Sequence, residues 1–175
     1  MSDKPELSQC HLSTEDGLKV RRISADEFRI PINFIKLHPD VLTPTKGSAG
    51  AACFDIAAYL DAPVSIRPFQ TALIPTGLSF RLPPNSEIQV RPRSGLPNKH
   101  RVFVANAPGT VDSDYHGELM VGLYNGNPDA VFVVHDGERI AQFLVAPVLD
   151  IRLNEIPYEE PSSERGENGF GSTGR

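Results

Sequence analysis

The chain has 175 residues, of which 39% are hydrophobic and 22% charged, and its formal net charge is −5. This size suits one globular domain, and the acidic balance argues against nucleic acid as a partner, because phosphate backbones select for a basic face. Membrane insertion is not expected either, since no apolar run reaches spanning length. Two cysteines (Cys10 and Cys53) are too few for a disulfide scaffold, which favours a reducing, cytoplasmic setting.

Short apolar runs are separated throughout by proline (16 residues) and glycine (14 residues), a pattern typical of an all-β protein. Residues 1–31 form a polar N-terminal extension to which we assign no role, with one short helix expected near 24–28. Strands are predicted, in chain order, over 32–37, 54–60, 72–82, 87–91, 102–105, 119–124, 130–135, 140–145 and 148–153. Residues 43–48 are expected to form a loop. The sequence therefore predicts a jelly roll or β-barrel over 32–156, followed by a linker and flexible C-terminal arm over 157–175.

Two segments carry polar groups at or near the end of predicted strands. Asp55 follows an apolar run, where a carboxylate is usually a solvated turn residue. Arg93, Ser94 and Gly95 combine a guanidinium, a hydroxyl and a flexible backbone, which together suit phosphate oxygens. A surface turn with solvated arginines explains this second segment about as well.

Residues 106–118 contain the turn residues of a hairpin but also two acids, a tyrosine and a histidine within five positions. Turn chemistry does not explain Asp112 directly after the apolar Val111, or Tyr115 at the bend. A carboxylate in this position can act as a general base on water. Further along, Gln142 lies near the start of an apolar strand, where a structural role is the more frequent one.

The C-terminal arm contains a G-x-G-x-x-G string over 169–174. No helix follows it in the sequence, so a dinucleotide-binding strand–turn–helix unit is not favoured. Composition alone favours a disordered terminus. The arm nevertheless carries Arg165, Ser172 and Thr173, which suit phosphate, and Phe170, which can stack on a base.

Taken in order, the four internal segments and the arm resemble the five motifs of the trimeric deoxyuridine triphosphatases (dUTPases), over residues 32–175. The most specific strings are Arg-Ser-Gly-Leu at 93–96, Gly-Thr-Val-Asp-Ser-Asp-Tyr at 109–115 and Arg-Gly-x-x-Gly-Phe-Gly-Ser-Thr-Gly at 165–174. The resemblance implies a jelly-roll subunit and a homotrimer with active sites at subunit interfaces. It also implies Mg²⁺-dependent hydrolysis of dUTP to dUMP and pyrophosphate, which limits uracil incorporation into DNA and supplies dUMP for dTMP synthesis.

The same resemblance implies a role for each matching residue. Asp112 would orient and activate the water that attacks the α-phosphate, and Asp55 would reach Mg²⁺ through metal-bound water. Tyr115 would pack under the deoxyribose and exclude a 2′-hydroxyl. The implied substrate-binding residues are Asn106, Gly109, Thr110 and Val111 at the uracil; Arg93, Ser94, Gly95 and Gln142 at the phosphates; and Arg165, Phe170, Gly171, Ser172 and Thr173 in the arm, with Phe170 over the uracil face.

Three positions depart from the usual family pattern. Cys53 and Arg101 stand where glycine is common, and His116 stands where arginine is frequent. None of these changes removes a group that the hydrolysis needs.

Two alternatives of different kinds remain open. The related dCTP deaminases share the fold, but their catalytic glutamate lies on the strand where this chain has Gly122. A non-catalytic trimer that binds a nucleotide and regulates a partner protein is the other alternative. It would not need to keep Asp112, Arg165 and Phe170 together, so their joint presence favours an enzyme.

Overall fold

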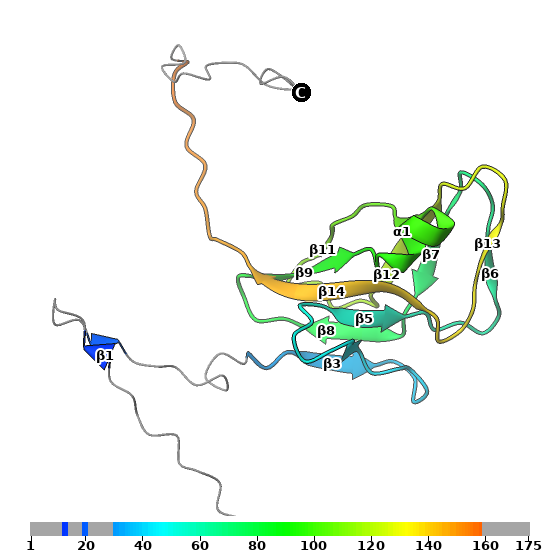
Figure 1. The fold of residues 1–175 in the computed structure, drawn as a ribbon. Coiled ribbons are helices and arrows are strands. Elements are labelled where there is room, and N and C mark those ends of the chain that lie inside the picture. Colours follow the sequence, from blue (N-terminus) through cyan, green and yellow to red (C-terminus); the bar gives the residue numbers. More distant parts are fainter. Residues whose placement is uncertain (1–11, 14–18, 21–29, 159–175) are drawn as a thin grey trace, which may run out of the picture.

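The computed structural model describes residues 12–13, 19–20 and 30–158, and this part of the chain consists of β-strands and one short helix (Figure 1). The strands are β1 (Leu12–Ser13), β2 (Lys19–Val20), β3 (Asn33–Lys36), β4 (Thr45–Lys46), β5 (Phe54–Ala57), β6 (Val64–Ile66), β7 (Thr71–Pro75), β8 (Leu78–Arg81), β9 (Ser86–Arg91), β10 (Val102–Val104), β11 (Gly109–Val111), β12 (Met120–Asn125), β13 (Phe132–Val134) and β14 (Arg139–Pro147). The helix is α1 (Gly95–His100). The all-β class predicted from the sequence is confirmed.

Two larger sheets share one core. The first has five strands in the order β11-β9-β14-β5-β4, and the second has three in the order β10-β12-β7. Along β12 every second residue is buried, as expected for a strand with one face on the core. Buried side chains of both sheets, among them Ile56, Ile74, Ile88 and Leu123, belong to a single hydrophobic cluster. Figure 1 shows α1 at one end of this arrangement, close to β12.

Several short elements were not expected from the sequence. The predicted strand 72–82 is divided into β7 and β8 at Gly77, whose φ of +65° is strained for any residue with a Cβ. The expected loop 43–48 contains β4, and β6 and α1 lie where no regular element was predicted. Each of these elements has six residues or fewer, too few for a hydrophobic period to show.

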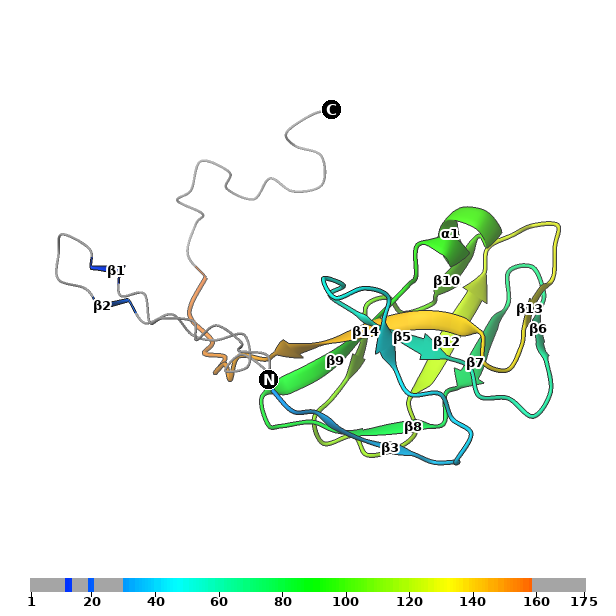
Figure 2. The ribbon, with the colours of Figure 1, turned by 60° about the horizontal axis from the view of Figure 1, so that its bottom comes forward.

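The predicted strand over 148–153 is wrong for the single chain. Its apolar residues alternate as a strand's do, yet Leu149 is 81% exposed, and Ile151 and Leu153 are also exposed. Figures 1 and 2 both show residues 148–158 running away from the sheets after β14. A strand requires a neighbouring strand for its hydrogen bonds, and none of the described residues supplies one here. The short helix expected near 24–28 lies outside the described residues.

The predicted strands that flank 106–118 pair with each other as β10 and β12, as a hairpin requires, but the connection between them contains the additional strand β11. β10 before the turn pairs with β12, whereas β11 after it pairs with β9. The segment therefore connects the two larger sheets. Val111 at the end of β11 lies opposite the fully buried Ile88, so pairing with β9 brings β11 onto the shared core.

Helix α1 ends at Arg101, which has a left-handed backbone with φ of 57°. Its N–H group donates to the carbonyls of Leu96 and Pro97, as in helix ends that favour glycine at this conformation. This geometry explains why glycine is common at this position in the family that the sequence resembles. Arg101 adopts the same conformation at a steric cost of about 1 kcal/mol.

Asn125 is the one fully buried amide side chain of the described residues, and all its bonds are made. Its Nδ2 donates to the carbonyls of Ile66 (2.9 Å) and Ala130 (2.8 Å), and its Oδ1 accepts from the Asn127 amide (2.9 Å). We expect Asn125→Ala to lower the free energy of unfolding by about 2 kcal/mol, because the buried carbonyl of Ile66 and two part-buried backbone groups lose their partners. Urea denaturation measures this. Asn127→Ala, at a half-exposed position, serves as the control; equal losses in the two variants would contradict the prediction.

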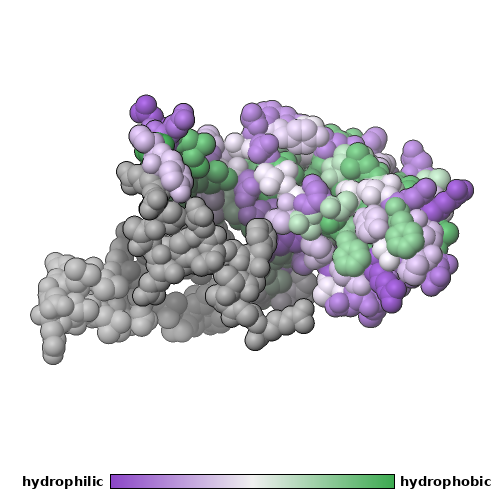
Figure 3. All heavy atoms as spheres, turned by 90° about the horizontal axis from the view of Figure 1, so that it is seen from above, coloured by the Kyte–Doolittle hydropathy of each residue, from purple (hydrophilic) through white to green (hydrophobic). Residues whose placement is uncertain are grey.

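Within the described part of the chain, no helix has the length and apolar character needed to cross a bilayer. Apolar side chains at the surface lie among polar ones on the face shown in Figure 3.

Candidate active site

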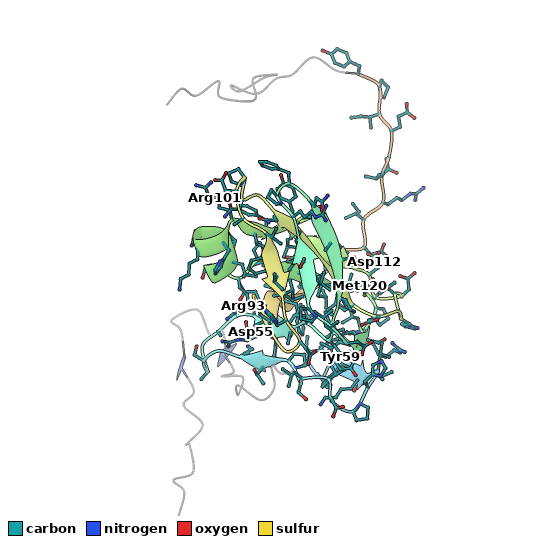
Figure 4. The ribbon with its side chains drawn as sticks, turned by 90° about the vertical axis from the view of Figure 1, so that its right-hand side faces the viewer. Asp55, Tyr59, Arg93, Arg101, Asp112 and Met120 are labelled. Atoms are coloured by element: carbon teal, nitrogen blue, oxygen red, sulfur yellow. The ribbon has the colours of Figure 1, made fainter. Side chains whose placement is uncertain are left out.

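One half of the site is an ion-paired cluster around Asp55 on β5. Arg93 Nε lies 2.9 Å from Asp55 Oδ1, and Arg139 Nη1 lies 3.2 Å from Oδ2. Arg93 Nη1 also donates to the carbonyl of Arg139 (3.2 Å). The Asp55 side chain is only 14% exposed and that of Arg93 is 29% exposed, so this pair is partly dehydrated, whereas the Arg139 side chain is 59% exposed. Figure 4 shows Asp55 and Arg93 together.

A change of strand register places Arg139 and Gln142 beside this cluster. The pairing of β14 with β5 shifts between Arg139 and Ala141, and both Ile140 and Ala141 are buried. Such bulges redirect side chains and often lie next to active sites. Gln142 then lies opposite Asp55, and its Nε2 donates to the carbonyl of Pro92 (2.9 Å). Gln142 thus anchors the backbone that leads into Arg93.

Ser94 and Gly95 lie at the first turn of α1. The Ser94 hydroxyl forms no helix cap, and no hydrogen bond joins it or the Gly95 amide to any described residue. Both residues are exposed, so these donors remain available to an anion. Their position at the phosphates stays a prediction.

A pocket of about 430 Å³ lies beside this turn, lined by Arg93, Gly95, Lys99, His100 and Arg139 together with Leu96, Gly137 and Glu138. The sequence analysis missed Lys99, His100 and Arg139. Lys99 follows Gly95 by four positions on a helix and so lies on the same face, which is the one sequence signal that could have identified it. No sequence signal links Arg139 to Asp55, because they are 84 residues apart.

The other half of the site is a pocket of about 210 Å³ after β11. It is lined by Thr110, Val111, Asp112, Tyr115, Glu118, Leu119 and Met120, so four of the predicted residues meet here. The Asp112 carboxylate is exposed. Tyr115 donates its hydroxyl to the carbonyl of Glu118 (2.9 Å), and its amide donates to the carbonyl of Asp112 (3.1 Å). A Cβ on Gly117 would meet the Tyr115 hydroxyl oxygen at 2.5 Å, so any larger residue there would displace the Tyr115 ring.

Asn106 and Gly109 lie together just before this pocket, and neither lines it. A Cβ on Gly109 would lie 3.1 Å from Asn106 Nδ2, so glycine lets the amide of Asn106 approach the start of β11. The buried Gly109 pairs with Val90 across the sheet.

The two pockets have no lining residue in common. In Figure 4, Asp112 lies near Met120 and apart from the Arg93–Asp55 pair. The volume of the smaller pocket is below the 300–1,000 Å³ usual for a small-molecule site. The groups in the larger pocket that could act as a general base are a histidine and a glutamate, and this glutamate is bonded to a backbone amide. Within its described part, one chain therefore presents two separate pockets, each lined by some of the predicted site residues.

Asp55 is compatible with a magnesium ion held through water. No group of three or more His, Cys, Asp or Glu side chains forms a metal cage among the described residues. Mg²⁺ does not require one, because it keeps several waters and takes substrate phosphates as ligands. Each Asp55 oxygen accepts one guanidinium hydrogen bond and retains a lone pair, so it can also accept from a metal-bound water.

The departures from the family pattern leave both halves intact. The backbone carbonyl of His116 accepts from Ser79 Oγ (2.9 Å), and its side chain is exposed. Cys53 is a half-buried free thiol directly before β5.

Gly122 lies on β12 opposite Leu73, so this strand carries no carboxylate there. The arm residues Arg165, Phe170, Gly171, Ser172 and Thr173 lie outside the described residues.

Tyr59 lies elsewhere in the structure, near three aspartates. Desolvation, followed by the negative charges of Asp40, Asp61 and Asp136, raises the pKa of the Tyr59 phenol above its usual range. His38 stacks on its ring at 4.9 Å. The phenol therefore stays neutral at physiological pH, and none of these residues lines either pocket.

A family model described as dUTPase matches residues 40–174. A deoxyuridine 5′-triphosphate nucleotidohydrolase of Desulfotalea psychrophila is 51% identical over 131 residues, which cover 75% of this chain and 86% of that protein. The enzyme of the same name from Treponema denticola is 48% identical over 142 residues, covering 81% of this chain and 96% of that protein.

Solved structures agree on the fold. A mutant dUTPase of Staphylococcus bacteriophage 80alpha with dUpNHpp has a TM-score of 0.71 at 23% identity and covers 83% of this chain and 99% of that chain. A mutant dUTPase of phage phi11 of S. aureus, described with a structural Mg(II) ion, has a TM-score of 0.66 at 19% identity and covers 75% of this chain and 99% of that chain. The predicted jelly-roll or barrel-like fold of these proteins is confirmed.

Proposed function

Since the chain belongs to the dUTPase family, we propose that it hydrolyses dUTP to dUMP and pyrophosphate with Asp112 as the residue that activates the attacking water. Membership of this family identifies the chain as a dUTP diphosphatase. The observation that carries the finer mechanism is the pair of pockets, one with a carboxylate and an aromatic ring, the other with several cations. Hydrolysis of this nucleotide limits uracil incorporation into DNA and supplies dUMP for dTMP synthesis.

Asp112 is suited to general-base chemistry because its carboxylate is exposed at the rim of the smaller pocket. It accepts a proton from water while the oxygen attacks the α-phosphate, and the pyrophosphate leaves with the bond's electron pair. Tyr115 packs under the deoxyribose, and Asn106 with Gly109 to Val111 binds the uracil. The arm covers the nucleotide through Phe170 and Gly171.

Negative charge on the triphosphate is stabilised by the other half of the site. Arg93 is already oriented by its bond to Asp55, so it loses little freedom when it binds phosphate. Gly95 lines the same pocket, Ser94 directly precedes it, and Gln142 lies opposite Asp55 in the sheet. Arg165, Ser172 and Thr173 of the arm bind the phosphates together with them. Asp55 would hold Mg²⁺ through water, and the ion would supply charge neutralisation and orientation of the phosphates.

The protein acts as a homotrimer with active sites at subunit interfaces. Two observations support this. The residues proposed for water activation and for phosphate binding lie in pockets without a common residue, as expected if a second copy brings the other half. Residues 148–156 also expose alternating apolar side chains that no described part of the chain covers. A cytoplasmic location stays a prediction.

We expect the purified protein to release pyrophosphate from dUTP in the presence of Mg²⁺ and to be slow with dTTP, dCTP and UTP. The assay compares the four nucleotides with and without Mg²⁺, and ammonia release from dCTP is followed in parallel. Ammonia from dCTP would identify a deaminase instead. Tight dUTP binding without pyrophosphate release would favour the non-catalytic alternative.

A further inference from the structure

Glu118 joins the nucleoside-binding segment to the turn between β7 and β8. Its Oε1 accepts two backbone hydrogen bonds, from the amides of Thr76 (3.1 Å) and Gly77 (2.7 Å). A carboxylate oxygen that accepts from two adjacent amides is held in one position, because any rotation lengthens at least one bond. Glu118 also lines the pocket of Asp112 and Tyr115.

The turn that receives Glu118 is itself firmly held. Thr76 is buried, and its Oγ1 donates to the carbonyl of Leu119 (2.6 Å). Leu37 donates its amide to the carbonyl of Gly77 (2.8 Å), and Tyr59 donates its amide to the carbonyl of Pro75 (2.9 Å). The turn is thus bonded on both sides and forms a fixed support for Glu118.

The fixed position of Glu118 in turn restrains the ring of Tyr115. The Tyr115 ring is 47% exposed, so packing restrains it only in part. Its hydroxyl donates to the backbone carbonyl of Glu118, and it forms no other side-chain hydrogen bond with the described residues. The position of the ring therefore depends on the position of the Glu118 backbone, which the two amides of the turn determine through the side chain.

We propose that Glu118 is a positioning residue that sets the preference for deoxyribose over ribose by holding Tyr115 in place. The proposal rests on the proposed function, in which Tyr115 excludes a 2′-hydroxyl. Steric exclusion of one hydroxyl is lost when the excluding ring moves by about 1 Å. The role of Glu118 needs an acceptor oxygen at this place and does not need a negative charge.

The test compares Glu118→Ala with Glu118→Gln, whose amide oxygen can accept the same two bonds. We expect Glu118→Ala to raise KM for dUTP and to lower the dUTP/UTP ratio of kcat/KM by about tenfold, with a smaller change in kcat. Glu118→Gln should restore both values to near wild type. Glu87→Ala, on β9 and outside both pockets, is the matched control for loss of a glutamate.

A second variant tests the same link without altering Glu118. Tyr115→Phe removes only the hydroxyl that donates to the Glu118 carbonyl, and it should lower the dUTP/UTP ratio as well. The double variant with Glu118→Ala should be no worse than the stronger single variant, because both act on one connection. This variant also keeps the proposal testable if Glu118→Ala does not fold.

Different outcomes separate the two proposals. A wild-type protein that does not hydrolyse dUTP refutes the proposed function, and calorimetric binding of dUTP and UTP then tests Glu118 by the same ratio of affinities. A wild-type protein that is active, with a lower melting temperature but an unchanged dUTP/UTP ratio in Glu118→Ala, overturns the positioning role alone. Failure of Glu118→Gln to restore the ratio overturns it too.

Discussion

Asp112→Asn is expected to lose turnover by a factor of about 10²–10⁴, the usual contribution of a general base, while it still folds and binds dUTP. The amide has nearly the same shape as the carboxylate but cannot take the proton from water. The side chain is exposed and makes no hydrogen bond with the described residues, so the fold does not depend on its charge. Pyrophosphate release measures turnover, and calorimetry with dUTP measures binding.

Asp114→Asn is the matched control for this variant. Asp114 lies two positions further along the same segment, is exposed and does not line the pocket of Asp112. It should retain near wild-type turnover. If Asp112→Asn were as active as this control, Asp112 would not be the base.

Mixing two inactive variants tests whether two subunits share one site. Asp112→Asn retains the cation cluster, and Arg93→Ala retains Asp112, so a site between one copy of each is complete. Random assembly of equal amounts should restore about a quarter of wild-type turnover, because each site draws one half from each of two copies. A mixture that stays inactive, although mixed trimers form, would place both halves of the site in one chain.

Truncation after Ser163 has the second largest expected effect, a fall in kcat/KM of about 10²-fold or more. It removes Arg165, Phe170 and the hydroxyls of Ser172 and Thr173, which we propose to close on the bound nucleotide. It leaves the core untouched, because the buried hydrophobic residues of the described chain all lie between Val41 and Phe143. The truncated protein should therefore keep its circular dichroism, its melting temperature and its trimeric mass.

Removal of Arg175 alone is the control for this truncation, since it shortens the same end and leaves residues 165–174 in place. This shorter deletion should have little effect on dUTP hydrolysis. Normal hydrolysis by the protein truncated after Ser163 would exclude a catalytic role for the arm. Loss of the trimer on truncation would show that these residues contribute to assembly instead.

Local patterns in the sequence were sufficient for the fold class, and the resemblance to the dUTPase motifs supplied most of the candidate site residues. The alternation along β12 and the Gly-Thr-Val-Asp string at β11 lie within a few neighbouring residues, so they can be recognised in the sequence before the fold is known. The predicted Thr110, Val111, Asp112 and Tyr115 line one pocket because a single short segment carries them all. Arg93 and Gly95 line the other for the same reason.

What local patterns could not supply were the contacts between distant parts of the chain. Arg139 meets Asp55 across 84 residues, and Glu118 meets Thr76 across 42 residues; neither pair has a local sequence signature. The alternation over 148–153 predicted a strand, but a strand also needs a neighbour, and the single chain provides none in its described part.

The sequence by itself therefore determined which chemical groups are available: a carboxylate that can activate water, cations and amides that can bind phosphate, and strands to support them. Only the tertiary structure decided that these groups line two separate pockets, and that Glu118 lines one of them and Arg139 the other. The physical reason is that propensity and periodicity act over a few residues, whereas sheet pairing and ion pairs depend on which distant segments the core brings together.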